Sequence, residues 1–411
     1  METHPSKEIV GKVNSYLAGH CIVVGVTGSV SLYRSLDLAR WLMRRGARVR
    51  VVMTRAAASL VSPQMFEWAT GEPVVVDISG RIEHVEYAKW CDAMVVAPAT
   101  LSTMAKIAFG VTDNSVALTA VAMRGESKPV LIVPAMHGNM AESPAYKEAV
   151  SKLVGQGYSL IPPKVENGVA KYPDVWLVGR VTAALASRGR DLEGARVLVM
   201  AGATREWIDE VRFISNPSSG FMGIDLAVEA WARGAHVDLV YGHVEHPLPH
   251  VVSLHSVETT EEMAEKVRIL SSRGYDIVVA AAAPADFRPA KRVEGKIRSG
   301  VKITLELEPT PKVIEELRAK PGVLVAFAAE AAGSLEELEA SAREKMDKYG
   351  ASIVVANRVG RRLDVGFSSD KLEALLLWKS RGKVYVERVG RISKEELSRQ
   401  IIDTALSISV G

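Results

Sequence analysis

The sequence predicts an α/β protein with two doubly wound domains, each built on a mostly parallel β-sheet. Apolar segments of about four to seven residues alternate with helical patterns from Cys21 onward. This alternation is typical of parallel sheets that carry helices on both faces. The chain has 411 residues, enough for two or three domains, and 48% of them are apolar, which suffices to fill the cores.

The segment Leu185–Ala195 separates the two domains in this prediction. It is short and charged, it contains glycine, and an apolar strand pattern begins directly after it. Domain boundaries fall in exposed segments of this kind, where few contacts cross. We therefore expect one domain over residues 1–190 and a second over residues 191–411.

The composition argues against several classes of protein. The formal net charge is only +3 and no dense basic stripe is present, so a nucleic-acid partner is not expected. No window is long and uncharged enough to span a membrane, and the polar segment Met1–Lys12 does not resemble a signal peptide. Cys21 and Cys91 lie at the edges of apolar strand patterns, so we expect buried free thiols. Together these features predict a cytoplasmic enzyme in a reducing environment.

The first domain is predicted from four buried strands. They are Cys21–Val26, Val49–Met53, Met94–Ala97 and Val130–Val133, and a helix over Val30–Arg45, ended by Gly46, joins the first two. Ligands of doubly wound sheets bind at the carboxyl ends of the strands. The residues that directly follow each strand are therefore the first candidates for a site.

Turn-forming and polar residues follow all four strands. Gly25–Val30 reads G-V-T-G-S-V at the start of a helix, where Gly28 and Ser29 would cradle a phosphate. Thr54 follows the second strand, Ala97–Asn114 the third, and Pro134–His137 the fourth. One such loop is weak evidence, but four at equivalent places are expected to converge on one pocket.

These four segments resemble the flavin-dependent cysteine decarboxylases, including the phosphopantothenoylcysteine decarboxylases, over roughly Gly19–Pro173. The resemblance implies a bound FMN. It places FMN contacts at Gly28, Ser29, Thr54, Thr100, Leu101, Ser102, Thr103 and Ala135. It places substrate contacts at Asn114, in the family's D-N pair with Asp113, and at Met136, His137 and Lys171.

His84 is the candidate catalytic residue of this domain. By itself it would be read as a surface histidine on the amphipathic helix of Ile82–Asp92, I-E-H-V-E-Y-A-K-W-C-D. The decarboxylase family, however, places its active-site histidine in this context. Imidazole suits proton transfer near neutral pH, so the resemblance implies a catalytic role for His84.

Two departures from the family pattern concern the substrate. His137 stands where the bacterial enzymes have an asparagine, and it can still donate a hydrogen bond. The segment Glu166–Asp174 lacks the lid cysteine that protonates the product in those enzymes. Lys171 is the nearest ionisable residue, and it acts either as an acid, if burial lowers its pKa, or as a ligand for phosphate or carboxylate. The sequence therefore does not identify the residue that donates the proton to the decarboxylated product.

The second domain is predicted as another Rossmann-like sheet that ends in an antiparallel hairpin. The predicted strands are Arg196–Met200, His236–Val240, Asp276–Ala283, Gly322–Ala328 and Ile353–Ala356, followed by a hairpin of Leu372–Trp378 and Lys383–Arg388. The predicted helices are Gly220–Arg233, Thr259–Leu270 and Lys394–Ser407, the last capped by Ser393.

A long polar loop over Met200–Gly223 connects the first strand of this domain to its helix. Loops of such length are uncommon and usually functional. Ser218 and Ser219 occupy the position expected of an N-cap, and Gly220 would let the backbone approach a ligand. The free N–H groups at this helix N-terminus predict an anion site.

This loop, with T-R-E-x-I-D-x-V-R-x-I-S-N-x-S-S-G-x-M-G, resembles the signature of phosphopantothenate–cysteine ligases. Other strand ends match the same family, including the Glu294–Ser299 loop and Gly366–Asp370. The resemblance implies CTP as co-substrate, with Mg²⁺ held mainly through the triphosphate, and implies that Asn216 binds the acyl intermediate. It places CTP contacts at Ala280, Ala281, Ala282, Asp286, Lys296, Pro309, Thr310, Pro311, Lys312, Phe327, Lys345 and Lys348.

Three positions depart from the ligase pattern. Phe221 replaces a lysine and Arg358 an aspartate, and a second triphosphate lysine of the family falls at Tyr349, one place from Lys348. The assignment of Lys348 is therefore weaker than that of Lys345. CTP and ATP also remain alternatives at this point.

Taken together, the two resemblances imply a bifunctional enzyme of coenzyme A biosynthesis. The second domain would join cysteine to phosphopantothenate through an acyl-cytidylate, and the first would decarboxylate the product to phosphopantetheine with FMN. The family also implies a homo-oligomer, a dodecamer or else a trimer. The apolar helices Leu101–Ala108 and Val116–Met123 add modest support for such contacts.

Three alternatives are open. The second domain could be an NAD-linked dehydrogenase, although G-x-G-x-x-G is absent and S-N-P-S-S-G is present. The first could be a flavin prenyltransferase or a peptidyl-cysteine decarboxylase, although its fusion to a ligase argues otherwise. The chain could also be a non-catalytic flavin-binding regulator, which His84 and the ligase loops oppose.

Overall fold

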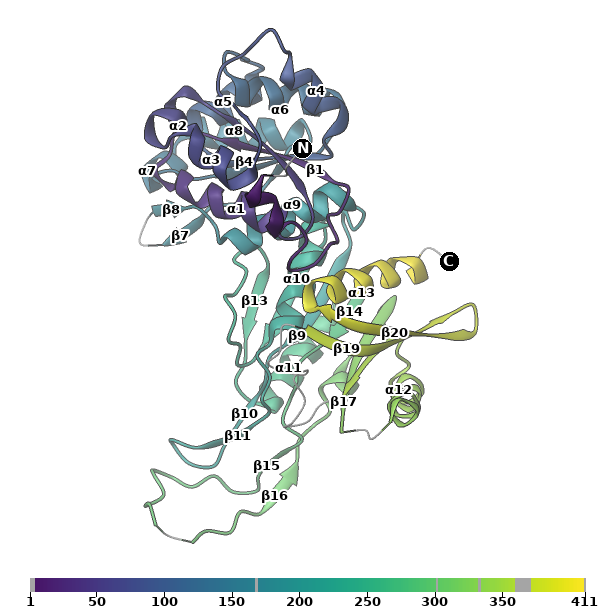
Figure 1. Ribbon diagram of the computed structural model, residues 1–411. Helices are drawn as coiled ribbons and strands as arrows, with labels where there is room; N and C mark the ends of the chain where they lie inside the picture. Colours follow the sequence, from purple (N-terminus) through teal and green to yellow (C-terminus); the bar gives the residue numbers. More distant parts are fainter. Residues whose placement is uncertain (1–3, 167–168, 301, 332–333, 359–370, 410–411) are drawn as a thin grey trace. The chain divides into compact units, whose positions relative to one another are not determined.

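The computed structural model describes residues 4–166, 169–300, 302–331, 334–358 and 371–409. The chain forms two compact units, Met1–Asp191 (unit 1) and Leu192–Gly411 (unit 2), and each is described by itself (Figure 1). The family match predicted at Gly366–Asp370 lies outside the described residues.

Unit 1 is organised around a six-stranded parallel sheet with the order β3-β2-β1-β4-β5-β6. Its strands are β1 Cys21–Val26, β2 Arg48–Met53, β3 Val74–Val75, β4 Ala93–Ala99, β5 Val130–Pro134 and β6 Ser159–Leu160. Strands β2 and β3 extend the sheet in one direction from β1, and β4, β5 and β6 extend it in the other. This is the doubly wound order that the alternating pattern predicts.

Helices cover both faces of this sheet, as predicted. One face carries α1 Arg34–Met43, α3 Pro63–Thr70 and α9 Val175–Ser187, and the other carries α4 Glu83–Trp90, α5 Leu101–Phe109, α6 Ser115–Gly125 and α8 Pro144–Gly155. Strands β1, β4 and β5 are consequently buried along their whole length. The short α2 Arg55–Leu60 and α7 Gly138–Ala141 and the small antiparallel pair β7 Lys164–Glu166 and β8 Val169–Lys171 complete the unit.

The helix predicted to begin at Val30 starts with a different geometry. Val30–Tyr33 is a 3-10 turn, and the α-helix begins at Arg34. The Ser29 hydroxyl, which caps this turn, lies 3.5 Å from the Ser31 nitrogen.

Cys21 and Cys91 are joined by a disulfide bond, so the expectation of free thiols is wrong. Cys21 opens β1, and Cys91 follows α4 just before β4. Ile22 pairs with Ala93 in the sheet, and this pairing brings Cys21 and Cys91, which lie just before them in sequence, close together. The strand register, which the sequence does not reveal, creates this contact.

Unit 2 is organised around an eight-stranded sheet with the order β13-β12-β9-β14-β17-β18-β19-β20. Its strands are β9 Arg196–Ala201, β12 His236–Tyr241, β13 Ser253–Ser256, β14 Ile277–Ala280, β17 Val323–Glu330, β18 Ile353–Arg358, β19 Lys371–Ser380 and β20 Lys383–Ser393. The first six are parallel and follow the same spatial order as in unit 1. The last two form the predicted antiparallel hairpin.

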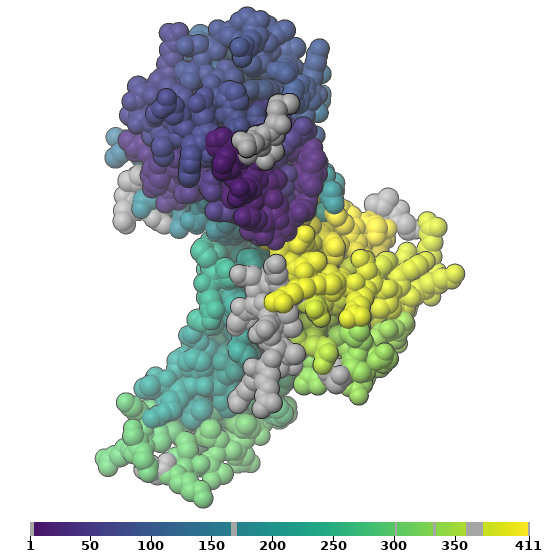
Figure 2. Space-filling view, viewed as in Figure 1, coloured from purple at the N-terminus to yellow at the C-terminus, as the bar shows by residue number. Residues whose placement is uncertain are grey.

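Two helices cover each face of the unit 2 sheet. The pair α10 Phe221–Ala232 and α13 Lys394–Ser409 packs on one face, and α11 Thr260–Ser271 and α12 Leu335–Tyr349 pack on the other. In Figure 2 the hairpin and α13, coloured yellow, form one continuous region of the surface. Two small antiparallel pairs, β10 Arg205–Trp207 with β11 Phe213–Ser215 and β15 Phe287–Pro289 with β16 Leu307–Pro309, form a projecting arm (Figure 1).

Two details of unit 2 differ from the prediction. The N-cap of α10 is Gly220, in the left-handed region at φ 73°, rather than Ser218 or Ser219. A side chain at position 220 would collide with Val244, so glycine is required there. The predicted strand Asp276–Ala283 ends as β14 at Ala280, because the backbone then turns along a cavity.

Candidate functional sites

Unit 1 has a cavity of about 570 Å³ at the carboxyl end of its sheet. It lies at β1 and β4, the adjacent strands between which the strand order reverses. Doubly wound sheets bind ligands at this switch point. The cavity is lined by Gly28, Thr54, Arg55, Ala56, Val76, Asp77, Ile78, Thr100, Ser102, Thr103, Lys106, Asp113, Asn114 and Ser115.

Three helix N-caps place polar side chains in this cavity. Thr54 caps α2, Thr100 caps α5 and Asn114 caps α6, and each side chain accepts a hydrogen bond from a backbone N–H of its helix. The cap residues follow β2, β4 and α5 in sequence, so the sheet brings them together from separate segments. Free N–H groups at the same helix ends favour an anionic ligand.

A buried hydroxyl fixes the relative position of β1 and β4 at this edge. Thr27 is fully buried, and its Oγ1 donates to the carbonyl of Pro98 at 2.7 Å and accepts from the N–H of Thr100 at 3.0 Å. Ser115 in the same way donates to the Met53 carbonyl at 2.8 Å. Neither residue was predicted from the sequence, although their positions just after a strand and at a helix start were a usable signal.

Two ion pairs border the unit 1 cavity. Lys106 lies 2.6 Å from Asp113, and Arg55 lies 2.6 Å from Asp77. Hydrogen bonds from Lys106 and Asn114 lower the pKa of Asp113 below its usual value. The cavity therefore presents two cations, each already balanced by a carboxylate.

The structure brings together only some of the residues predicted for this site. The cavity is lined by Gly28, Thr54, Thr100, Ser102, Thr103 and Asn114. Among the described residues, its wall does not include Ser29, Leu101, Ala135 or Met136. His137, which caps α7, and Lys171, which ends β8, are exposed, and α7 packs against β8. His84 is half-buried on α4 and is not part of the cavity wall among the described residues.

Unit 2 has a cavity of about 430 Å³ at the carboxyl ends of β9, β14, β17 and β18. Its wall includes the predicted Asn216, Ala280, Ala281, Ala282, Asp286, Thr310, Pro311, Lys312, Phe327 and Lys345. It also includes Ser218, Ser219, Gly220, Phe221, Tyr349, Asn357 and Lys394. Seven separate segments of the chain thus meet around one space.

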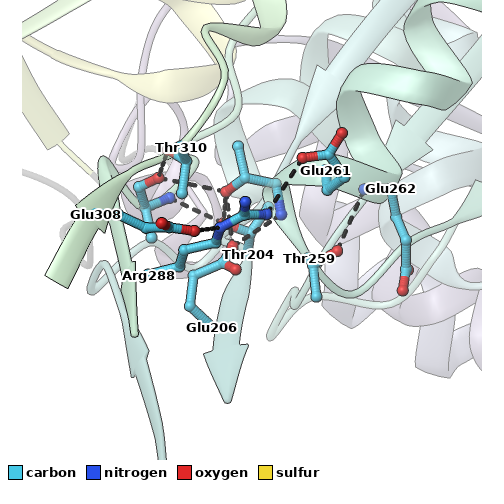
Figure 3. A network of polar contacts seen from close by, with 10 residues as sticks. Thr204, Glu206, Thr259, Glu261, Glu262, Arg288, Glu308 and Thr310 are labelled. Carbon is cyan, nitrogen blue, oxygen red and sulfur yellow. Dashed lines mark hydrogen bonds and ion pairs between the residues drawn. The ribbon is translucent and has the colours of Figure 1, made fainter. Parts of the chain in front are cut away.

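The loop of residues 283–286 forms one side of this cavity, and its backbone is held from several directions. Nδ2 of Asn216 donates to the carbonyls of Ala283 at 3.3 Å and Pro284 at 2.9 Å. Ala285 donates its N–H to Thr204 at 2.8 Å and accepts from the hydroxyl of Thr310 at 2.6 Å (Figure 3). Hydrogen bonds from Asn216, Thr204 and Thr310 therefore hold the backbone of this loop.

Three lysines reach the wall of the unit 2 cavity. Lys312 pairs with Asp286 at 2.6 Å, and Lys345 pairs with Glu330 at 2.8 Å. The hydrogen bond to Asp286 raises the pKa of Lys312, so this ammonium stays charged over the physiological range. Lys394 is 4% exposed, and its Nζ lies 5.7 Å from the centre of the Phe221 ring.

Three residues predicted for this site lie elsewhere in the described structure. Lys296 is exposed in the loop between β15 and β16, Pro309 ends β16, and Lys348 pairs with Glu315 at 3.8 Å. The helical period explains the last case, because Lys345 and Tyr349 are four residues apart and share a face of α12. Lys394 was missed because it lies far along the chain, just after the hairpin.

Two negative findings apply to the part of the chain that the structure describes. Its His, Cys, Asp and Glu side chains form no group of three or more that could hold a metal ion. None of the helices in those residues has the length and apolar character needed to cross a bilayer.

Comparison with known proteins gives the same division of the chain. The family described as Flavoprotein matches residues 11–186, and the family described as DNA/pantothenate metabolism flavoprotein C-terminal domain matches residues 192–408. The first match covers the unit 1 cavity and the second the unit 2 cavity.

Similarity to characterised proteins extends over almost the whole chain. It is 41% identical to the coenzyme A biosynthesis bifunctional protein CoaBC of Thermococcus kodakarensis, covering 97% of this chain and 98% of that protein. The CoaBC of Methanocaldococcus jannaschii is 35% identical, covering 97% and 96%, and that of Escherichia coli K12 is 32% identical, covering 94% and 97%. The chain therefore belongs to the family of bifunctional coenzyme A biosynthesis proteins, with a flavoprotein decarboxylase domain followed by a ligase domain.

Proposed function

We propose that the unit 2 cavity binds CTP and phosphopantothenate and joins the latter to cysteine. The observation that carries this proposal is the convergence of Ala280–Ala282, Asp286, Thr310–Lys312, Phe327 and Lys345 on one space with Asn216. These residues come from four segments that the ligase signature assigns to the nucleotide, and Asn216 is assigned to the acyl group. A random distribution of the matching motifs would not gather them around a single cavity.

The chemistry of ligation explains why such a cavity needs cations and an amide. A carboxylate repels nucleophiles and has a poor leaving group, so it must first be activated as an acyl-cytidylate, which the amine of cysteine then attacks. Lys312 and Lys345 would neutralise phosphate oxygens, and Asn216 would hold the activated acyl group beside the loop of residues 283–286. Mg²⁺ would enter with the triphosphate rather than through a protein ligand set.

For the unit 1 cavity, FMN is the proposed flavin. The caps Thr54, Thr100 and Asn114 and the turn at Gly28 offer hydroxyl, amide and N–H groups of the kind that hold a phosphate and a ribityl chain. Lys106 and Arg55, each paired with a carboxylate, offer further N–H donors at the same wall. When bound, FMN supplies an electron acceptor that makes loss of carbon dioxide from the cysteine moiety feasible.

His84 is proposed as the base of the decarboxylation. It lies on α4, its side chain forms no hydrogen bond or ion pair with another described residue, and it is not part of the unit 1 cavity wall. This position suits the homo-oligomer that the decarboxylase family implies, in which the histidine serves the flavin site of a neighbouring copy. The dodecamer, or else a trimer, therefore remains part of this proposal.

The structure alters the support for this assembly. The apolar side chains of α5 and α6, which the sequence offered as candidates for an interface, are mostly buried inside unit 1. Exposed apolar residues lie instead on α2 and α3, where Leu60, Met65 and Trp68 are 53%, 47% and 58% exposed. Light scattering on the purified protein tests the oligomer, and a monodisperse, fully active monomer would refute it.

For Lys171 we propose substrate binding rather than proton donation. Its side chain is exposed at the end of β8, whereas a lysine acid requires burial to lower its pKa. It lies on the strand against which α7 packs, and α7 directly follows His137. The two residues are therefore candidates for binding the phosphate or carboxylate of one substrate. We also propose a cytoplasmic location, where these substrates occur.

One experiment tests both reactions. The purified protein, loaded with FMN, is incubated with phosphopantothenate, cysteine and Mg²⁺, with CTP and ATP supplied in separate reactions, and the products are identified by mass. We expect phosphopantothenoylcysteine, CMP and pyrophosphate from CTP, followed by phosphopantetheine and carbon dioxide. Product formation in the reaction with ATP but not in the one with CTP would overturn CTP as the co-substrate. The absence of flavin absorbance in the isolated protein would overturn FMN as the cofactor.

A further inference from the structure

A chain of buried hydrogen bonds runs behind the wall of the unit 2 cavity and ends on a carboxylate. It involves Ala285, Thr204, Thr260 and Glu206, which are 3%, 0%, 0% and 4% exposed. Figure 3 draws Thr204, Glu206 and Thr310 in one network of polar contacts, together with Thr259, the N-cap of α11. Glu206 itself is not part of the cavity wall among the described residues.

The atoms of this chain define the direction of every hydrogen bond. Oε1 of Glu206 accepts from both the N–H of Thr260, at 2.8 Å, and its hydroxyl, at 2.7 Å. Because the Thr260 hydroxyl proton is used in this way, the 2.8 Å contact between the hydroxyls of Thr204 and Thr260 must have Thr204 as its donor. The Thr204 oxygen is then the acceptor for the N–H of Ala285, at 2.8 Å.

One alternative arrangement is weaker. The Thr260 hydroxyl also lies 3.3 Å from the carbonyl of Ala285, to which it could donate instead. That contact is 0.6 Å longer than the one to Glu206, and the Ala285 carbonyl already accepts from Thr310 at 2.6 Å. A carboxylate is also the stronger acceptor. The Thr260 hydroxyl therefore donates its hydrogen bond to Glu206.

The far end of this chain is the loop that shapes the nucleotide cavity. Ala285 lies between Pro284 and Asp286, and all three residues line the cavity. Its N–H is held by Thr204 and its carbonyl by Thr310, so each of the two peptide planes that flank Ala285 is held by a hydrogen bond. Loss of the Glu206 carboxylate would leave the buried N–H of Thr260 without this acceptor. It would also free the Thr260 hydroxyl proton to turn toward Thr204 or the Ala285 carbonyl, which changes the hydrogen bonds that hold the loop.

We propose that Glu206 is a positioning residue of the ligase, which acts through Thr260 and Thr204 to hold the loop of residues 283–286 in its nucleotide-binding shape. Glu206 belongs to the T-R-E segment of the signature, whose function the cavity wall alone does not explain. The inference rests on the proposed use of the unit 2 cavity for CTP. It assigns to this glutamate an effect on nucleotide binding without contact to the nucleotide.

The test measures KM for CTP and kcat of pyrophosphate release in the full-length, FMN-loaded protein. Glu206→Ala and Thr204→Val each remove one link of the chain, and we expect KM for CTP to rise about tenfold, with a smaller change in kcat. Glu206→Gln and Thr204→Ser keep an acceptor and a hydroxyl at the same places, so they are expected to stay within about threefold of the wild type. Carbon dioxide release from phosphopantothenoylcysteine should be unchanged in all four variants.

Thr259 provides a matched control, because it precedes Thr260 but serves another purpose. Its hydroxyl caps α11 by accepting from the N–H of Glu262 at 3.2 Å and takes no part in the chain. Thr259→Ala should lower the unfolding temperature and leave KM for CTP unchanged. An equal rise of KM in Thr259→Ala would reduce the effect to general destabilisation and overturn the proposal.

Other outcomes are also decisive. If Thr204→Val binds CTP as the wild type does, or if Thr204→Ser is as impaired as Thr204→Val, Glu206 does not act through this chain. The threonine pair decides the question even if Glu206→Ala fails to fold. A wild-type protein that forms no product with CTP but ligates with ATP would refute the proposed nucleotide, and the same comparison of KM would then be made with ATP.

Discussion

The carboxylate of Asp209 accepts a hydrogen bond from the backbone N–H of Ile297 at 3.0 Å, which joins two segments 88 residues apart. The same carboxylate accepts from the N–H groups of Val211 and Arg212, at 2.8 and 2.7 Å, and its side chain is completely buried. Ile297 directly follows Lys296, the lysine assigned to phosphate by resemblance. Asp209 of the signature therefore positions the loop that carries Lys296.

The ionisation of Asp209 makes this contact sensitive to pH. Burial by itself opposes ionisation, but hydrogen bonds from Ile297, Val211 and Arg212 outweigh it and lower the pKa of Asp209 well below the ordinary value of about 3.9. A carboxyl with a lowered folded-state pKa contributes stability above its unfolded pKa and loses it as pH falls. We expect Asp209→Asn to lower the unfolding temperature at pH 7, with a smaller difference from the wild type below about pH 4.

Thermal unfolding of wild type and variant across this pH range checks the Asp209 prediction. Glu210→Gln is the matched control, because the neighbouring Glu210 pairs only at the surface with Arg292, at 2.8 Å. Surface pairs contribute little, so the control should behave as the wild type does. A pH-independent difference for Asp209→Asn would contradict the assigned cause.

Lys345 and Lys348 should differ sharply in their effect on the ligase. Lys345 lines the unit 2 cavity, whereas Lys348 points to Glu315 and lies 5.1 Å from the Tyr349 ring. We expect Lys345→Ala to raise KM for CTP by about tenfold or more, through loss of a charge-assisted contact with phosphate. Lys348→Ala should change KM by less than about twofold. Steady-state pyrophosphate release decides the matter, and equal effects of the two substitutions would show that the cavity wall misidentifies the phosphate lysine.

Asn216→Asp should slow ligation while FMN stays bound. The Asn216 side chain donates to the carbonyls of Ala283 and Pro284, and a carboxylate at this position would face both oxygens without a proton to share. It would also repel the carboxylate or phosphate of the substrates. We expect product formation with CTP to fall at least about tenfold. Flavin absorbance is the internal control for an intact unit 1, and an unchanged rate with CTP would contradict the role of Asn216.

His84→Ala should remove carbon dioxide release and leave ligation intact. The side chain lies in unit 1, and every residue of the ligase cavity lies in unit 2, so the two activities should separate. General base catalysis contributes about 100-fold to 10,000-fold, which sets the size of the expected loss. The two reactions are assayed separately, with phosphopantothenoylcysteine supplied for the second. Lys89→Ala, on the same helix, is the control, and near wild-type decarboxylation by His84→Ala would end the proposed role.

Loss of the disulfide between Cys21 and Cys91 should destabilise unit 1. The bond joins residues 70 apart in sequence, and a loop of this length corresponds to about 4 kcal/mol of stabilisation through the entropy of the unfolded chain. We expect Cys91→Ser to lower the unfolding temperature of unit 1, and a reductant to have the same effect on the wild type but none on the variant. Mass analysis after thiol labelling under denaturing conditions checks the bond directly, and two labelled thiols in the untreated protein would contradict it.

The sequence by itself determined the fold class and most of the strands. Short, fully apolar segments such as Cys21–Val26 are typical of strands covered on both faces, and β1 has the predicted bounds. It also indicated where the cavities lie, because residues that follow parallel strands meet at one edge of a sheet. Local patterns in the chain are sufficient for both conclusions.

Only the tertiary structure decided which side chains meet. The disulfide depends on the register of β1 with β4, and Lys394 reaches the unit 2 cavity because α13 packs on α10. Which of the two lysines, Lys345 or Lys348, lines the cavity depends on which face of α12 is turned to the sheet. The hydrogen bonds that link Ala285 to Glu206 likewise join segments more than 50 residues apart. Contacts of this kind arise from packing between distant segments, and no local pattern in the sequence encodes them.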